Sequence, residues 1–224
     1  MVCVVMTTYF SDSHPQREKY AHKAVGSLLE HLHCESGLYL HIADDSEQIN
    51  PTTRDLMKQA HSEWEVSSTY SNSGHRGIGA SLNCALNGLP VNEWMYTTDD
   101  WVLTDFLDLD VPIRLLHSGY DLVRLGPIHP DLQCVTRFQA GLGWWLDLNP
   151  HYGGFCFATR PFIATKAFYA KVGPFDEQLN SYETERLYAQ KVANSTCKLA
   201  YWGAVDLAGP WEHIGEDNVG FLEI

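Results

Sequence analysis

Long hydrophobic runs are missing from this 224-residue chain. Beyond Met1, its longest uninterrupted apolar stretch is Val2–Met6, whereas a helix that spans a membrane needs about 20 such residues. Residues 1–10 also lack a basic leader and a cleavage-type site, so we expect no signal peptide and no transmembrane segment. We therefore expect a cytoplasmic protein, and its length suits one domain with a sizeable core.

Clusters of lysine and arginine are also missing. The 15 basic residues are scattered singly among 28 acidic ones, which gives a formal net charge of −13. Binding along a nucleic-acid backbone depends on clustered basic residues, so this charge counts against a nucleic-acid partner without excluding one. An anionic ligand would have to be held locally, by a few arginines, a helix N-terminus or a metal ion.

Cysteine pairs with metal-binding or redox spacing are missing as well. The six cysteines stand at positions 3, 34, 84, 134, 156 and 197, and none of them forms a Cys-x-x-Cys pair. This pattern predicts reduced, mostly buried thiols.

The first hundred residues alternate between strand and helix patterns. Apolar, β-branched runs predict strands over residues 1–7, 37–43, 63–70 and 94–98, and apolar residues at helical spacing predict helices over 15–32, 51–61 and 77–89. Such alternation indicates a parallel sheet with right-handed crossovers.

After residue 104 the pattern is mixed. We expect a short helix or loop at 105–116, a hairpin or irregular segment at 130–152 and a tail at 206–224. We also expect strands at 120–126, 154–158 and 198–202 and helices at 163–172 and 182–194. The predicted fold class is α/β, a Rossmann-like, mostly parallel sheet flanked by helices, with a mixed α+β C-terminal half.

Two predicted strands end in pairs of carboxylates. The strand at 94–98 runs into Asp99-Asp100, and the strand at 37–43 runs into Asp44-Asp45. Each pair could close a turn or cap a helix. Ligands of open α/β sheets, however, bind at the carboxyl ends of the strands, where these acids could bind a divalent cation or contact a base or ribose.

Other polar residues are candidates for the same site. Arg76 precedes a predicted helix, where it is either solvent-exposed or a phosphate contact, and Asn83 within that apolar helix needs a polar partner. Glu183 and Glu185 are either ordinary acids of a first helical turn or a catalytic base. His213 is either structural or a metal ligand.

The sequence contains two further patterns, a pair of tryptophans and a pair of histidines. Trp144-Trp145 belongs either to the core or to an aromatic platform for a sugar or base. His31-x-His33 reads as a solvated face at the end of a helix.

Eight short segments carry a resemblance to a known family. In the first half they are Val4–Tyr9, Ser27-Leu28-Leu29, the Ile42–Ser46 segment with its Asp-Asp-Ser, the Gly79–Leu86 helix and the Tyr96–Asp100 segment; in the second half they are Val172–Glu177, Tyr182–Glu185 and His213-Ile214-Gly215. In this order they resemble the family-2-type glycosyltransferases with the GT-A fold. Tyr96–Asp100 looks like that family's DxD-type metal motif, and Val172–Glu177 is similar to its Gly-Gly-Phe-Asp-Glu.

The resemblance implies one GT-A domain, with a nucleotide-sugar-binding half at 1–103 and an acceptor-binding, catalytic half at 104–224. It implies transfer of a sugar from a nucleoside diphosphate, which we expect to be UDP, to an acceptor hydroxyl. Thr7 and Tyr9 would border the base, Asp44 would pair with a uracil-type edge, and Asp99 would touch the ribose or the metal.

The resemblance also implies a metal ion and a base. Asp100 would bind Mn²⁺ or Mg²⁺, His213 would complete the metal shell, and Glu183 or Glu185 would be the base of an inverting displacement. Leu82 stands where the family often has arginine, so Arg76 would take over phosphate binding.

The acceptor stays open between a glycan, a lipid-linked sugar, a protein, a small molecule and, less readily, a modified nucleic acid. No membrane helix follows His213, so we do not expect a polymer-extruding synthase. The alternatives are a non-catalytic nucleotide- or sugar-binding domain and a nucleotidyltransferase, which usually has a glycine-rich basic loop after its first strand. Residues 9–13 contain neither glycine nor a basic residue.

Overall fold

A computed structural model describes residues 1–12, 14–64, 67–127, 134–149, 157–203 and 209–215. The helices are α1 (Gln16–His31), α2 (Pro51–Trp64), α3 (Ile78–Gly88), α4 (Asp110–His117), α5 (Lys166–Val172) and α6 (Ser181–Ala193). The strands are β1 (Val2–Thr8), β2 (Leu32–His33), β3 (Leu38–Asp44), β4 (Ser68–Asn72), β5 (Glu93–Thr98), β6 (Trp101–Leu103), β7 (Leu107–Asp108), β8 (Leu122–Arg124), β9 (Cys134–Gln139), β10 (Gly143–Leu148), β11 (Phe162–Thr165), β12 (Leu199–Tyr201) and β13 (Trp211–His213).

One sheet runs through both halves of the chain. Its strand order is β4-β3-β1-β5-β11-β8-β12-β10-β9. The strands β4, β3, β1 and β5 are parallel, β11 is antiparallel to both of its neighbours, and β8 and β12 are parallel. This architecture confirms the predicted α/β class with a mostly parallel sheet.

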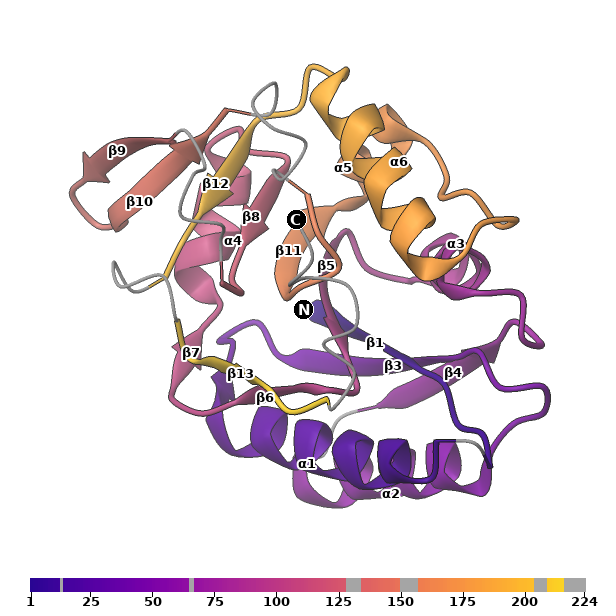
Figure 1. The fold of residues 1–224 in the computed structure, drawn as a ribbon. Coiled ribbons are helices and arrows are strands. Elements are labelled where there is room, and N and C mark those ends of the chain that lie inside the picture. The colour runs from indigo at the N-terminus through magenta and orange to yellow at the C-terminus, as the bar shows by residue number, and fades with distance from the viewer. Residues whose placement is uncertain (13, 65–66, 128–133, 150–156, 204–208, 216–224) are drawn as a thin grey trace.

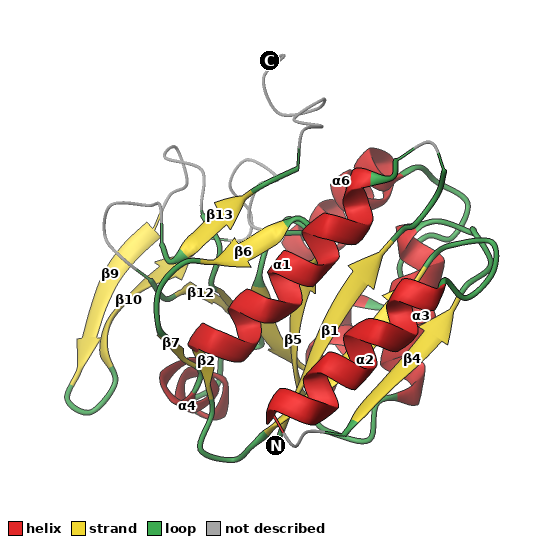
Figure 2. Cartoon of the chain, turned by 90° about the horizontal axis from the view of Figure 1, so that it is seen from below, coloured by secondary structure: helices red, strands yellow, loops and turns green. Residues whose placement is uncertain are grey.

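Helices cover both faces of the parallel part (Figures 1 and 2). Helices α1 and α2 lie on one face, and α3 and α6 lie on the other. All seven residues of β1 are buried, because alternate side chains enter opposite cores: Val4 and Met6 pack with α1, and Cys3 and Val5 pack with α3 and α6. Burial on both faces explains why this strand reads as an unbroken apolar run rather than an alternating one.

The predicted helix at 163–172 is wrong in its first three residues. Phe162–Thr165 forms β11, which inserts antiparallel between β5 and β8, and α5 begins only at Lys166. The Thr165 hydroxyl accepts a hydrogen bond from the Phe168 amide at 3.2 Å and so caps α5. The β-branched side chains of Ile163 and Thr165 favour a strand, and threonine suits the N-cap position. The predicted start of the helix therefore lies three residues too early.

Two other predicted boundaries shift. Helix α2 extends to Trp64, so the strand predicted from residue 63 begins only at Ser68. Of the strand predicted at 154–158, residues 154–156 lie outside the described residues, and 157 and 158 belong to neither a helix nor a strand.

The segment predicted as a hairpin or irregular structure contains the antiparallel pair β9–β10. The two tryptophans of β10 have different environments. The Trp145 side chain is buried, and its Nε1 donates to the Tyr120 hydroxyl at 2.8 Å, whereas Trp144 is 64% exposed beside Phe138. One tryptophan is therefore a core residue and the other a surface residue.

Within the described residues, none of the helices combines the length and the apolar character that crossing a membrane requires. The five cysteines that the structure describes are free thiols; Cys3, Cys34 and Cys197 are buried, and Cys84 and Cys134 are exposed.

Candidate functional site

A cavity of ≈ 340 Å³ lies at the carboxyl ends of β1 and β5. Its lining comes from the ends of these strands, the loops after β3 and β4, the first turn of α1, and the beginnings of α3 and α6. The described lining residues are Thr7, Thr8, Tyr9, Arg17, Asp45, His75, Gly77, Ile78, Ser81, Thr98, Asp100, Leu179, Asn180 and Ser181. This is the edge at which open α/β sheets bind their ligands.

His213 lies against Asp100, which is one of the residues that line this cavity. His213 Nε2 lies 3.3 Å from Asp100 Oδ2, because β13 pairs antiparallel with β6 and places His213 opposite Trp101. Burial opposes ionisation of Asp100, but hydrogen bonds from His213 and Thr98 outweigh it and hold the pKa of this carboxyl below its ordinary value. Asp100 is thus an ionised acid at the cavity wall.

A glycine allows the backbone to close over this pair. A Cβ on Gly215 would lie 3.1 Å from Asp100 Oδ2 and 3.1 Å from His213 Cε1. The amide of Ile214 donates to the Asp100 carbonyl at 2.9 Å and fixes the segment there. The backbone after β13 therefore packs directly on both side chains.

The Asp100–His213 pair fits a divalent cation. Two ligands at right angles, each about 2.1 Å from an ion, are about 3 Å apart, close to the separation found here. A carboxylate oxygen and an imidazole nitrogen suit Mn²⁺, and waters or phosphate oxygens would complete the coordination.

Asp99, the neighbour of Asp100, is buried and bound to Arg17. Its side chain is fully buried, Arg17 Nε donates to Oδ2 at 3.1 Å, and Arg17 Nη2 donates to Oδ1. Burial raises the pKa of Asp99 to about 7, against the opposing effect of the Arg17 charge. Asp99 is not among the described residues that line the cavity.

The two acids after β3 also differ. The buried Asp44 carboxylate accepts hydrogen bonds from the Ser46 amide (2.9 Å) and hydroxyl (2.5 Å), the Asn50 amide (3.3 Å) and the Thr53 hydroxyl (3.0 Å). Asp45 instead lines the cavity and accepts from the amides of Arg76 and Gly77. Asp44 therefore holds its own loop together, and Asp45 is the acid that reaches the cavity.

Thr7 and Tyr9 both line the cavity. The Thr7 and Tyr96 hydroxyls are 3.0 Å apart, and the Tyr9 ring stacks on His75 with ring centroids 5.0 Å apart. His75 has a φ of 59°, a conformation that non-glycine residues rarely adopt. The Tyr9–His75 pair forms an aromatic wall of the cavity.

The two candidate bases have different surroundings. Glu183 takes part in the N-terminal cap of α6: its amide donates to Asn180 Oδ1 at 2.9 Å, and its Oε2 accepts from the side-chain Nδ2 of Asn180 at 3.0 Å. Glu185 Oε2 accepts hydrogen bonds from the amide (3.1 Å) and the hydroxyl of Thr159. Burial raises the pKa of Tyr96, and the negative charges of Asp100, Glu185 and Asp99 raise it further. Glu185 therefore lies close enough to Tyr96 to act on it together with the two acids after β5.

Arg76 and Asn83 lie outside the described lining of the cavity. Arg76 Nε donates to the Ser73 carbonyl at 2.7 Å, and its Nη1 is 3.3 Å from Glu177. The buried Asn83 donates to the Phe175 carbonyl at 3.0 Å and to Glu177 at 2.9 Å. Both residues connect the first half of the chain to the segment before α6.

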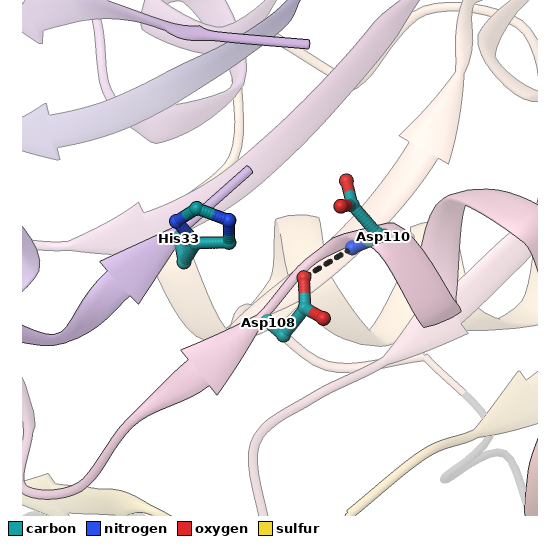
Figure 3. A group of neighbouring side chains, drawn as sticks. All are labelled: His33, Asp108 and Asp110. Carbon is teal, nitrogen blue, oxygen red and sulfur yellow. Dashed lines mark hydrogen bonds between the residues drawn. The ribbon is translucent and has the colours of Figure 1, made fainter. Parts of the chain in front are cut away.

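A second group of possible metal ligands lies near the C-terminal end of α1, whereas the first turn of that helix lines the cavity. Ligand atoms of His33, Asp108 and Asp110 all lie within 4.8 Å of one another, and Figure 3 shows their arrangement where β2 pairs with β7. Asp108 accepts from the Asp110 amide at 2.9 Å, and Asp110 accepts from the Glu35 amide at 3.2 Å. These hydrogen bonds give both acids an alternative role, as acceptors for backbone amides. His33 is exposed, as the sequence predicts.

Comparison with solved structures identifies the fold as that of GT-A glycosyltransferases. Neither protein-family models nor curated proteins give a match. Among solved structures, the mannosyltransferase PcManGT from Pyrobaculum calidifontis, in complex with GDP-Man and Mn²⁺, has a TM-score of 0.62 at 13% identity, over 97% of this chain and 58% of that one.

TarS from S. aureus is similar to the same degree. It has a TM-score of 0.62 at 16% identity over 90% of this chain, and its 1–349 form in complex with UDP-GlcNAc has a TM-score of 0.60 at 15% identity. The chain spans 35% of the TarS structure and 55% of the shorter form. At these identities the similarity establishes the fold.

The structure thus brings Thr7, Tyr9 and Asp100 to one cavity, with His213 in contact with Asp100. Sequence reasoning missed Arg17, which lines the same cavity. One signal could have revealed it: a cation in the first turn of a helix opposes the helix dipole and therefore calls for an anionic partner.

Proposed function

We propose that the protein is a glycosyltransferase that moves a sugar from a nucleoside-diphosphate sugar to an acceptor hydroxyl. The observation that carries this proposal is the Asp100–His213 pair, 3.3 Å apart at a cavity on the carboxyl edge of a GT-A-type sheet. Structures of the same fold contain UDP-GlcNAc in one case and GDP-Man with Mn²⁺ in another. We expect UDP as the nucleotide, with GDP as the other candidate.

In this proposal the base of the donor lies against the Tyr9–His75 wall, and its diphosphate points toward Asp100. Asp100 and His213 would hold Mn²⁺ or Mg²⁺. The ion would supply the positive charge that stabilises the departing diphosphate. Without a cation, the Asp100 carboxylate would repel the diphosphate, because like charges about 4 Å apart repel by about 4 kcal/mol near a protein surface.

The proposed reaction is a direct displacement. The acceptor oxygen forms a bond to the anomeric carbon as the bond from that carbon to the diphosphate oxygen breaks, and the hydroxyl proton passes to a carboxylate. The products are the glycoside and the nucleoside diphosphate, with inversion at the anomeric carbon. We assign the base to Glu185, because the Glu183 carboxylate is hydrogen-bonded to the side chain of Asn180, the N-cap residue of α6.

Thermal unfolding tests the metal and nucleotide assignment. UDP or GDP with Mn²⁺ at about 100 times the dissociation constant should stabilise the protein by about 2.7 kcal/mol, which raises Tm by about 5–10 °C. Asp100→Asn should abolish the part of this increase that depends on Mn²⁺, while Glu47→Gln, a change at an exposed acid after β3, should leave it intact. An undiminished Mn²⁺ effect in Asp100→Asn would contradict the assignment.

Product analysis by mass spectrometry, with panels of donors and acceptors, tests the transfer itself. Glu185→Gln should reduce turnover about 10²- to 10⁴-fold, the usual contribution of a positioned base. Glu183→Gln is the matched control: a glutamine oxygen can also accept from Asn180 Nδ2, and the backbone amide of residue 183 keeps its bond to Asn180 Oδ1, so the helix should stay intact. Loss of turnover in Glu183→Gln alone would move the base to Glu183, and nucleotide binding without any product would favour a non-catalytic binding domain.

A further inference from the structure

The pair formed by Arg17 and Asp99 joins two segments that are 82 residues apart. Arg17 lies in the first turn of α1, and Asp99 directly follows β5. Two nitrogens of the guanidinium group donate to the two oxygens of the carboxylate, so the contact is bidentate. A bidentate contact fixes the plane of the guanidinium as well as its position.

The two partners differ in their access to the cavity. Arg17 lines it and is 25% exposed, whereas the Asp99 side chain is 0% exposed and does not line it. A ligand in the cavity can therefore touch Arg17 but not Asp99 unless the pair separates. Separation would leave a buried carboxylate without its cation, which is unfavourable.

Arg17 is also distinguished by its charge. It is the sole lysine or arginine among the described residues that line the cavity, and two of the other lining residues, Asp45 and Asp100, are acids. A guanidinium has five N–H donors in a planar fork, a geometry that matches phosphate oxygens. Arg17 is therefore the basic side chain that an anion in this cavity would contact.

The position of Arg17 on its helix explains why it needs Asp99. The N-terminus of a helix carries a partial positive charge, which repels a cation in the first turn. Asp99 offsets this repulsion and holds the guanidinium at the cavity wall. The carboxylate thus has a positioning role that requires no contact with a ligand.

We propose that Arg17 binds the diphosphate of the donor and that Asp99 acts only through Arg17, as the residue that positions its guanidinium. This inference rests on the proposed function, and it replaces the ribose or metal contact that the sequence resemblance implies for Asp99. Asp100 and His213 then remain as the protein ligands of the cation.

A double-mutant cycle tests the inference. Dissociation constants of UDP, GDP and inorganic pyrophosphate, each with saturating Mn²⁺, are measured by calorimetry for the wild type, Arg17→Ala, Asp99→Asn and the double variant. We expect Arg17→Ala to weaken the binding of pyrophosphate and of the preferred nucleotide about 10- to 100-fold. Asp99→Asn should weaken both about 10-fold when Arg17 is present and less than 2-fold in the Arg17→Ala background.

Two controls accompany the cycle. Lys19→Ala removes an exposed cation from the same helix and should leave all affinities within 2-fold of the wild type. Arg17→Lys keeps the charge but loses the bidentate contact, so we expect it to have an intermediate affinity. It replaces Arg17→Ala in the cycle if that variant does not fold. Circular dichroism and Tm establish that each variant is folded.

The outcomes separate the two proposals. Asp99 touches the ligand directly, and the inference is wrong, in either of two cases. In the first, Asp99→Asn weakens nucleotide binding equally in both backgrounds. In the second, it weakens nucleotide binding but leaves pyrophosphate binding unaffected. If the wild type binds the nucleotide but neither Arg17→Ala nor Arg17→Lys weakens it, the inference alone fails. If the wild type binds neither nucleotide nor pyrophosphate, the proposed function fails and the inference fails with it.

Discussion

The side chain of Asn83 is bonded to the backbone of Phe175 at both ends of its amide. Nδ2 donates to the Phe175 carbonyl at 3.0 Å, and Oδ1 accepts from the Phe175 amide at 2.9 Å. Oδ1 also accepts from the Tyr169 hydroxyl at 2.8 Å. One buried asparagine on α3 therefore fixes the segment between α5 and α6.

Loss of this contact should destabilise the protein. Asn83→Ala leaves the buried carbonyl and amide of Phe175 without the partner they have here, and we expect a loss of about 3 kcal/mol in the free energy of unfolding. Urea denaturation measures it. Asn87→Ala, at an exposed position of the same helix, should change stability by less than about 0.5 kcal/mol. Equal effects of the two substitutions would contradict a structural role for Asn83.

Asp44 should also matter for stability. Its buried carboxylate accepts four hydrogen bonds from Ser46, Asn50 and Thr53, and the amide nitrogen of asparagine cannot accept any of them. We expect Asp44→Asn to lower the free energy of unfolding by about 2–4 kcal/mol, measured in urea, and Asp55→Asn on the surface of α2 to have little effect. An Asp44→Asn variant of normal stability that binds UDP weakly would instead favour the predicted contact with a base.

Gly79 allows α3 to pack closely against the segment before α6. A Cβ there would lie 2.1 Å from the carbonyl oxygen of Asp176, a backbone atom that cannot rotate away. Gly79→Ala should therefore reduce the free energy of unfolding by about 2–4 kcal/mol.

Gly88, at the end of the same helix, is the matched control for Gly79. A Cβ at this position would meet nothing within 4 Å, so Gly88→Ala should be neutral or stabilise by up to about 1 kcal/mol. Thermal or urea unfolding of both variants measures the difference. A well-tolerated alanine at position 79 would show that α3 does not pack this closely.

His41 should make stability depend on pH. It is buried on β3, with Nδ1 2.8 Å from the Thr69 hydroxyl and Nε2 3.0 Å from the Ser71 hydroxyl, and burial lowers its pKa from 6.5 to about 4. As pH falls from about 6.5 to 4, the unfolded chain takes up a proton at this histidine before the folded protein does. Stability is therefore lost over this window, by up to about 3 kcal/mol.

Comparison with a His41→Gln variant isolates this effect from the other groups that titrate over the same range. The free energy of unfolding, measured in urea at several pH values, should fall between pH 7 and pH 4 by about 3 kcal/mol more in the wild type than in the variant. Parallel profiles of the two proteins would show that His41 does not cause the pH dependence.

Several parts of the site follow from short stretches of sequence. Asp100 lies two residues after the apolar strand β5 ends, and Thr7 and Tyr9 flank Thr8, the last residue of β1. The rule that ligands bind at the carboxyl ends of strands therefore places all three at one edge. The same rule could not separate Asp44 from Asp45 or Asp99 from Asp100. In each pair, neighbouring side chains point in different directions, and the loop that surrounds them decides which one is buried.

The sequence by itself determined the elements whose patterns are local. The 3.6-residue period of α1 and the apolar runs of β1 and β5 predict these elements, because the pattern reports which faces of a segment are buried. Only the tertiary structure decided the insertion of β11 between β5 and β8, the burial of Asp99 against Arg17 and the meeting of His213 with Asp100. These contacts join residues that are distant along the chain, and they depend on the order in which the strands pair, which no local period encodes.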